Sequence, residues 1–587
     1  MIRVSVFQLR GHSLSEMDVT ENEIEAALAD LEKFPCDLAV FPECAFPAYY
    51  LAHWNDDAAE RSERMKSRVA RAARAARSYM VFGVPELAGP AISGRGRHGY
   101  GGPRLYNSVF VWGPQGELVT RCRKHFLWHF DSIWFDPGQE FASFDAPWGK
   151  VGLIVCADGR VPEVTRMLAT RGCTLIANAT NWVTSGRNPT MLSNPQAEYL
   201  MSVRAAENGV WIAAANKVGR EEDLLVFCGR SMVVSPDGEI VVEARPDEPA
   251  RLDYTILSDH GGTLATPASH RLSLRRPELY VRLTSETPSQ RMVAPSQRAM
   301  EREPGSAKST PYVAVVQRMR GIGDMDPQML PSELADVSRK LQVLGADIAV
   351  FSLSNAARPP AAPVIGETDL DGLVRESFTG SGILLMIPWV EQTSGGLRYV
   401  MLGYRDGQKT FRHMCLHGEG SAGAGETRTA GDPVSAHGIE CVDTDFGPVG
   451  IMLDIEGMVP EVARALALSG ARLIVWAADG RVAKHREIAR ARAMENRVFV
   501  VCANGAAGTG KPGAELGALP HLPSRPTRGE SLICDPDGRI IAEAFSDTDQ
   551  IVGAFADLPA TSRKQIVPGT DAFAGRMPRL YRELTSE

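Results

Sequence analysis

The sequence predicts an α/β protein built from two copies of one layered domain, in which helices cover two stacked sheets. Two observations support this fold class. Short apolar runs, which are typical of buried strands, alternate with amphipathic helical patterns through each half of the chain. Motifs of the first half also recur in the second half, in the same order and about 300 residues later.

The predicted elements follow one another in the same way in both halves. Apolar residues at helical spacing indicate a helix around 24–31 and another around 334–341. The Gly-rich stretch 93–102 predicts a flexible loop. A Pro-Asp-Gly turn at 236–238 predicts a hairpin. The predicted strands of the first half are 37–41, 80–84, 107–113, 151–155, 173–179, 211–216 and 231–235.

The repeated motifs define the domain organisation. Chance similarity between two α/β halves would not keep six motifs in register, so we infer a duplication. We expect one domain at 1–286, a linker at 287–311 that is rich in Pro, Ser, Gln and charge, and a second domain at 312–587. The matching pairs are Val4–Gln8 and Val313–Gln317, Asp37–Phe41 and Asp347–Phe351, Val151–Leu153 and Val449–Ile451, Val161–Val164 and Val459–Val462, Arg204–Asn208 and Arg492–Asn496, and Pro236–Gly238 and Pro536–Gly538.

The composition excludes several classes of protein. A formal net charge of −8 argues against a general nucleic-acid or membrane-surface binder. No apolar run approaches the ~20 residues that span a bilayer, and the N-terminus lacks the apolar core of a signal peptide. Ten cysteines in 587 residues, with no CxxC pair, indicate neither a disulfide scaffold nor a zinc site. We therefore expect a cytoplasmic protein.

Cys156 is the first candidate for chemistry. It follows the apolar strand at 151–155 and precedes Pro162 and Glu163, which favour the start of a helix. A cysteine on a strand-to-helix turn exposes its sulfur to nearby amide N–H groups, which favours the thiolate. The alternative is a buried structural cysteine at the end of a strand.

Two further charged residues stand close to predicted strand ends. Glu43 follows the strand at 37–41, where a carboxylate can act as a base. A helix cap or a loop ion pair is the alternative for this residue. Lys124 lies in or just past a strand, where a lysine is commonly a solvated side chain.

Taken together, these residues are more specific than each is alone. Phe41-Pro42-Glu43, Asn107-Ser108, Lys124 and the run VGLIVCADGRVPE at 151–163 stand in one order along the chain. In this order they resemble the nitrilase superfamily of carbon–nitrogen hydrolases, and the resemblance covers the first half. It implies an α-β-β-α sandwich and a catalytic triad of Glu43, Lys124 and Cys156. The second half resembles the same family in its frame only.

The implied triad has a defined chemistry. Glu43 takes the thiol proton, and Cys156 attacks an amide-type carbonyl carbon. Lys124 and the backbone N–H of Ala157 stabilise the developing oxyanion. Protonated Glu43 then gives its proton to the leaving amine or ammonia, and water activated by Glu43 cleaves the thioester. This chemistry implies no metal and no organic cofactor.

A second acid is expected after the lysine. Many family members carry a glutamate there, whereas the stretch 125–135 contains none. Asp131 is the nearest substitute and is one methylene shorter. The alternative is a rearranged pocket.

The residues after the cysteine narrow the substrate class. Asp158 makes the pattern C-x-D, which is similar to amidase and carbamoylase branches of the family. Arg160 stands where carbamoyl amino-acid hydrolases place an arginine for the substrate carboxylate, although an ion pair with Glu163 is an alternative. Trp128 and Trp182 are candidates to line the pocket, although core packing explains aromatic residues equally well.

The second copy lacks the triad. The register of the repeats places Leu353 opposite Glu43, Asp454 opposite Cys156, and His413 opposite Lys124. We therefore expect this copy to keep the fold without the chemistry. The resemblance implies that it acts as a built-in partner, with the two halves paired as a pseudo-dimer. Further homo-oligomerisation stays open.

The expected function is hydrolysis of a non-peptide C–N bond in a small amide or N-carbamoyl compound, through a cysteine thioester. A true nitrilase and an amide-forming acyltransferase are the alternatives among enzymes. A non-catalytic scaffold or binding protein is the alternative of another class.

Overall fold

The computed structural model describes the chain outside 89–102, 186–190, 260, 265, 287–308, 319–321, 323–324, 354–364, 394–395, 418–433, 436–437, 479, 481, 483, 506–528 and 587. The Gly-rich stretch at 93–102 and most of the predicted linker therefore lie outside the described residues. The chain divides into two compact units, which we call unit 1 and unit 2. Within the described ranges, no helix is long and apolar enough to cross a membrane.

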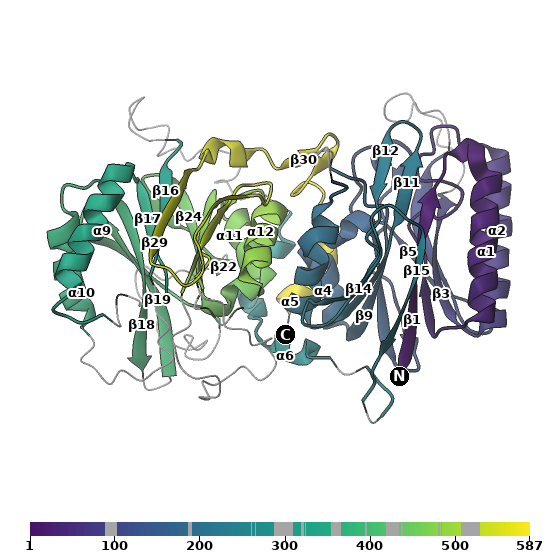
Figure 1. Cartoon of the computed structure of the whole chain (residues 1–587), viewed down its shortest axis with the longest axis horizontal. Helices are drawn as coiled ribbons and strands as arrows, with labels where there is room; N and C mark the ends of the chain where they lie inside the picture. Colours follow the sequence, from purple (N-terminus) through teal and green to yellow (C-terminus); the bar gives the residue numbers. More distant parts are fainter. Residues whose placement is uncertain are drawn as a thin grey trace. The chain divides into compact units, whose positions relative to one another are not determined.

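Unit 1 has the four layers that the sequence predicts, helix, sheet, sheet and helix (Figure 1). Helices α1 and α2 cover a sheet of order β12-β11-β1-β2-β3-β4-β5, with β15 also paired to β1 and β6 to β4. Helices α4 and α5 cover a sheet of order β14-β13-β10-β9-β8-β7. These elements are β1 (Ile2–Gly11), α1 (Met17–Lys33), β2 (Leu38–Val40), α2 (Asp56–Ala76), β3 (Tyr79–Leu87), β4 (Leu105–Trp112), β5 (Leu118–Arg123), α3 (Asp131–Trp134), β6 (Phe135–Asp136), β7 (Ser143–Ala146), β8 (Gly149–Val155), α4 (Pro162–Thr170), β9 (Cys173–Ala179), α5 (Met201–Asn208), β10 (Trp211–Ala215), β11 (Lys217–Glu221), β12 (Leu225–Cys228), β13 (Met232–Val234), β14 (Ile240–Glu243), β15 (Ala250–Ile256) and α6 (Ala268–Ser273).

Unit 2 repeats this architecture. Its sheets have the orders β20-β19-β18-β17-β16-β29 and β23-β24-β25-β26-β27-β28, with α9 and α10 on the first and α11 and α12 on the second (Figure 1). These elements are β16 (Tyr312–Gln317), α9 (Leu330–Leu344), β17 (Ile348–Phe351), α10 (Glu367–Phe378), β18 (Leu384–Thr393), β19 (Gly396–Arg405), β20 (Gln408–Met414), β23 (Val442–Thr444), β24 (Gly447–Leu453), α11 (Pro460–Leu468), β25 (Leu473–Ala478), α12 (His485–Asn496), β26 (Phe499–Asn504), β27 (Leu532–Cys534), β28 (Ile540–Glu543) and β29 (Gln550–Phe555).

Each unit has an apolar core between its first sheet and the two helices that cover it, and unit 2 has another between its two sheets. The central strands pair in parallel and are buried on both faces, which is why β8 and β24 are continuous apolar runs rather than alternating ones. The pairing register also repeats, because Val4 faces Leu38 in unit 1 and Val313 faces Ile348 in unit 2. This equivalence is consistent with the inferred duplication.

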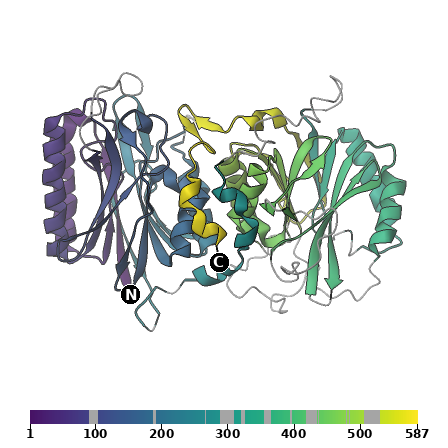
Figure 2. The ribbon, with the colours of Figure 1, turned by 180° about the vertical axis from the view of Figure 1, so that it is seen from behind.

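The units differ from the predicted domains at their ends. Unit 1 comprises Met1–Ser273 and Gln565–Leu584, whereas unit 2 comprises Leu274–Lys564 and Thr585–Glu587. Figure 2 shows the C-terminal segment in yellow beside the blue elements of unit 1. Each repeat therefore contributes its last segment to the other unit, so the expected boundary at 286 does not coincide with a unit boundary.

The counterpart of Lys124 in the second repeat is Cys415, so the expected pairing with His413 is wrong by two residues. The backbone N–H of Lys124 donates to the carbonyl of Asn107 (2.8 Å), just past β5. The N–H of Cys415 makes the same bond to Tyr399 (2.9 Å), just past β20. The hairpins before these positions differ in length, and a sequence comparison cannot see which strand residues pair across them.

Candidate active site

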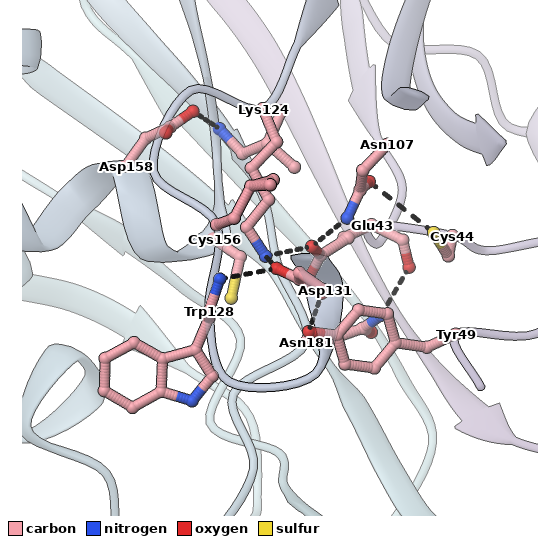
Figure 3. Close-up of polar contacts among 12 residues, drawn as sticks. Glu43, Cys44, Tyr49, Asn107, Lys124, Trp128, Asp131, Cys156, Asp158 and Asn181 are labelled. Carbon is pink, nitrogen blue, oxygen red and sulfur yellow. Dashed lines mark hydrogen bonds and ion pairs between the residues drawn. The ribbon is translucent and has the colours of Figure 1, made fainter. Parts of the chain in front are cut away.

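One buried lysine joins two carboxylates in unit 1. The ammonium group of Lys124 lies 2.7 Å from Glu43 Oε1 and 2.7 Å from Asp131 Oδ2. All three side chains are 0% exposed. The sequence candidates Glu43, Lys124 and Asp131 therefore meet at one point, with the Cys156 side chain on the same side of Lys124 (Figure 3).

Neighbouring strands set the positions of these charges. Glu43 follows β2 and Lys124 follows β5 of the same sheet, while Asp131 begins the short helix α3. Asn107 of β4 donates its amide to Glu43 Oε1 at 2.6 Å. The other carboxylate oxygen, Glu43 Oε2, is buried, and no group among the described residues hydrogen-bonds to it. This oxygen is available to accept a proton.

Asp131 is held by its own loop and by an aromatic hydroxyl. Its Oδ1 accepts a hydrogen bond from the Tyr49 hydroxyl at 2.7 Å, and its Oδ2 accepts one from the Trp128 backbone N–H at 2.8 Å. A shorter side chain than glutamate thus reaches Lys124 because the chain turns tightly between Trp128 and Asp131.

Burial and charge shift the pKa values of the cluster in opposite ways. Burial disfavours the charge of Lys124, but the carboxylates of Asp131 and Glu43 outweigh it and raise the pKa of the ammonium group well above its ordinary value. Burial raises the pKa of Glu43, and the charge of Asp131 adds to this effect, while Lys124 opposes it. Lys124 is therefore a permanent cation, and Glu43 is a stronger base than an exposed glutamate.

Cys156 stands on a strained turn between β8 and α4. Its φ of 47° is in the left-handed region that non-glycine residues rarely adopt. The turn is stabilised because the Cys156 N–H donates to Asn178 Oδ1 on β9 at 3.1 Å. Burial raises the pKa of the thiol to about 12, and the charge of Glu43 acts in the same direction, whereas Lys124 opposes both. The resting sulfur is therefore a thiol that needs a base.

Asp158 fastens this turn to the loop after Lys124. Its Oδ1 accepts the backbone N–H groups of His125 (3.0 Å) and Phe126 (2.8 Å), and its Oδ2 accepts the N–H of Val155 (3.1 Å). The aspartate of the C-x-D pattern thus connects two backbone segments of the site.

The other candidates lie around the cysteine. Ala157 is buried in the 3-10 turn Cys156–Arg160. The guanidinium carbon of Arg160 lies 4.2 Å from the ring centre of Trp128. Trp182 is 0% exposed, and its Nε1 donates to Gln196 (3.2 Å) when the Gln196 amide is oriented to donate also to the carbonyl of Cys156 (2.7 Å).

Several residues at the site were not singled out from the sequence for their roles. Tyr49, Asn178 and Asn181 are ordinary core positions by pattern, yet they bond to Asp131, the Cys156 N–H and the Glu43 carbonyl respectively. The Asn107-Ser108 motif is the one sequence signal for the bond of Asn107 to Glu43.

The chain belongs to the carbon–nitrogen hydrolase family. The model of that family, described as carbon-nitrogen hydrolase, matches residues 3–257 and 402–563. A protein of Pyrococcus abyssi named nitrilase is 30% identical over 254 residues, which is 42% of this chain and 87% of that protein. The mouse protein named omega-amidase is 27% identical over 257 residues, which is 42% of this chain and 85% of the other.

Solved structures are also similar to this chain. A mutant of the Nesterenkonia AN1 amidase, from the nitrilase superfamily, is 24% identical, with a TM-score of 0.39 over 48% of this chain and 96% of the other. From the family match, the protein is a carbon–nitrogen hydrolase.

Proposed function

We propose that unit 1 hydrolyses a small amide or N-carbamoyl compound through a thioester on Cys156. The arrangement of Lys124 between Glu43 and Asp131, beside a thiol on a strained turn, carries this proposal. The names of the relatives, nitrilase and omega-amidase, support a substrate whose carbon–nitrogen bond belongs to a nitrile or an amide.

The proposed acylation half of the reaction assigns a role to each of these groups. Glu43 Oε2 takes the proton of the Cys156 thiol as the sulfur forms a bond to the carbonyl carbon. The carbonyl oxygen becomes an oxyanion, which the ammonium group of Lys124 and the N–H of Ala157 stabilise. The carbon–nitrogen bond then breaks, Glu43 returns the proton to the leaving nitrogen, and the thioester remains.

Hydrolysis of the thioester uses the same groups. Glu43 takes a proton from water, and the hydroxide oxygen bonds to the thioester carbon. The second oxyanion collapses, the carbon–sulfur bond breaks, and the proton returns from Glu43 to the sulfur. The net reaction is amide plus water to acid plus ammonia or amine.

We further propose that Arg160 and Trp128 select the substrate. The Arg160 guanidinium lies over the Trp128 ring, 4.2 Å from its centre, and a guanidinium can bind a carboxylate through two parallel hydrogen bonds. Arg160→Lys should therefore raise KM for an amide with a distal carboxylate by about tenfold and leave KM for a neutral amide of equal length unchanged. Trp182, buried behind the cysteine turn, would shape the pocket wall.

The decisive experiment is turnover on a panel of amides, N-carbamoyl amino acids and nitriles, with Cys156→Ala as the blank. We expect ammonia release from amides or carbamoyl compounds and a loss of more than about 1000-fold in Cys156→Ala. Mass spectrometry of the acyl-enzyme should place the added mass on Cys156. Turnover of nitriles alone would support a true nitrilase, and turnover that survives Cys156→Ala would contradict the proposal.

A further inference from the structure

The last segment of the chain, Gln565–Leu584, is part of unit 1, and we call it the C-terminal strap. It begins with a hairpin, β30 (Gln565–Val567) and β31 (Thr570–Asp571), and it ends in two short 3-10 turns. The strap comes from the repeat that lacks the triad. Its contacts include the loop that carries Trp128 and Asp131.

Thr570 makes the central contact. Its hydroxyl oxygen accepts a hydrogen bond from the His129 N–H at 2.7 Å and donates one to the carbonyl of Leu127 at 3.3 Å. Thr570 is 3% exposed, so water cannot substitute for either bond. His129 has a φ of 51°, a conformation that costs energy in a non-glycine residue. The strap thus provides hydrogen-bond partners for the loop backbone at and beside His129, the residue with the strained φ.

The rest of the strap packs along the same loop and the adjoining helix. Gly575 lies so close to Phe126 that a Cβ would come within 2.4 Å of the ring. Arg576 pairs with Glu163 at the start of α4, 3.4 Å apart, with both side chains at least 96% buried. The Tyr581 ring stacks on Phe141 with the ring centres 6.4 Å apart. The strap therefore contacts both the loop that follows Lys124 and α4, the helix that follows Cys156.

His129 lies in the chain between Trp128, whose N–H holds the acid, and Asp131, which is the acid. The Trp128 N–H donates to Asp131, and Asp131 in turn holds Lys124. A change in the backbone at His129 therefore changes where the Asp131 carboxylate and the Lys124 ammonium group lie. A shift of about 1 Å in such groups can lower a rate by about 100-fold.

We propose that Thr570 is a positioning residue for the active site of the first repeat, and that the second repeat supplies it through the C-terminal strap. This inference rests on the proposed function of the Glu43, Lys124 and Cys156 site. It gives the second repeat a direct role in catalysis without any reactive group of its own.

The test compares three variants of the full chain. Thr570→Val removes both hydrogen bonds at almost constant shape, and Thr570→Ser keeps the hydroxyl. Thr561→Val is the matched control, because Thr561 is equally buried and its hydroxyl bonds to Leu558 in unit 2. Two readouts are used: steady-state kinetics on the best amide of the panel, and hydrogen exchange of the peptide covering 125–134.

We expect Thr570→Val to lower kcat by 10- to 100-fold, with KM changed less than threefold, and to speed amide exchange in 125–134 by at least tenfold. Thr570→Ser should restore both values to within about threefold, and Thr561→Val should leave both unchanged. Unchanged kcat and exchange in Thr570→Val would overturn the inference. So would faster exchange in β1 and β3 as well, because the strap would then support the whole unit.

The exchange measurement separates the two proposals. If the wild-type protein turns over no member of the panel, the proposed function fails, but exchange in 125–134 still reports whether Thr570 holds the loop. If turnover is present and Thr570→Val changes neither readout, the proposed function stands and the positioning role fails.

Discussion

At the scale of single residues, the site depends on one buried cation shared by two carboxylates. Taking each ion out of water costs several kcal/mol, and close, charge-assisted hydrogen bonds repay that cost only when the geometry is good. Here Lys124 lies 2.7 Å from both carboxylates, Asn107 donates to the Glu43 oxygen that Lys124 contacts, and Tyr49 donates to the second oxygen of Asp131. Glu43 Oε2 is the exception, because no described residue hydrogen-bonds to it, and in the proposed mechanism it takes the thiol proton.

The first prediction concerns the acid side of the pH–rate profile. Protonated Glu43 cannot accept the thiol proton, and burial raises the pKa of Glu43. We therefore expect kcat/KM to fall with decreasing pH at a value above ~4.3, the ordinary pKa of a glutamate. The measurement is kcat/KM for one amide between pH 4 and pH 9. An acid limb below the ordinary glutamate value would contradict this assignment.

The second prediction is that Asp131→Asn shifts the acid limb of the pH–rate profile. The charge of Asp131 raises the pKa of Glu43, so its removal lowers that pKa and shifts the acid limb to lower pH. At the same time kcat should fall about tenfold or more, because Lys124 loses an anionic partner. The same profile measured on this variant checks both effects. A limb that moves to higher pH would show that another group is the base.

At the scale of elements, the cysteine turn is conserved in shape between the repeats although its chemistry is not. Asp454 has a φ of 49° where Cys156 has 47°. Glu456 accepts the N–H groups of Leu453 and Leu416, as Asp158 accepts those of Val155 and His125. The turn and the carboxylate that accepts its backbone N–H groups are therefore part of the fold, since unit 2 keeps both without counterparts of Glu43, Lys124 and Cys156.

Asp158 and Glu456 offer a matched pair of variants, one in each unit. In Asp158→Asn, an amide N–H₂ replaces a carboxylate oxygen that accepts a backbone N–H, so at least one of these hydrogen bonds is lost. The change should destabilise unit 1 by roughly 1–3 kcal/mol, with a clear loss of activity. Glu456→Gln makes the equivalent change in unit 2 and should leave activity within about twofold. Calorimetry and kinetics on both variants check this. An equal loss of activity in Glu456→Gln would contradict the assignment.

Adding a nucleophile alone should not make the second repeat catalytically active. Asp454→Cys in a Cys156→Ala background places a thiol on the same turn, but Leu353 and Cys415 stand where Glu43 and Lys124 would be. We expect no turnover above the Cys156→Ala blank, because neither of these two positions supplies a base or a cation. The measurement is ammonia release over the full substrate panel. Turnover in this variant would mean that the triad is not required.

At the scale of the whole molecule, each repeat ends in the unit of the other. The strap of the second repeat pairs Arg576 with Glu163 in unit 1. The segment after Ser273, from the first repeat, pairs Arg275 with Glu461 in unit 2 at 2.8 Å. The same buried ion pair thus recurs at the start of α4 and of α11. Pairing of the two halves as a pseudo-dimer stays a prediction.

These two ion pairs give the last prediction. Arg576→Ala leaves Glu163 with a broken buried pair, which costs about 3–5 kcal/mol, and it should lower both the melting temperature of unit 1 and the activity. Arg275→Ala should destabilise unit 2 by a similar amount and leave activity within about twofold at 20 °C. Calorimetry with kinetics below the first transition distinguishes them. Equal activity losses would argue against a specific role for the strap.

The sequence by itself determined the duplication and the layered fold, and it supplied the prediction of a triad at Glu43, Lys124 and Cys156. All of these depend on local patterns: apolar periodicity, turn residues and short motifs in a fixed order. The strand-to-helix turn at Cys156 is one example, because Pro162 and Glu163 favour the start of the helix that follows.

Only the tertiary structure decided how those parts are completed. It brought Asp131 to Lys124, it made Cys415 rather than His413 the counterpart of Lys124, and it placed Thr570 on the loop of the other repeat. Such contacts join positions that are as many as 443 residues apart, so no local pattern carries them. They form because each buried N–H, carbonyl and charge must find a partner, and the packed units determine which partner is near.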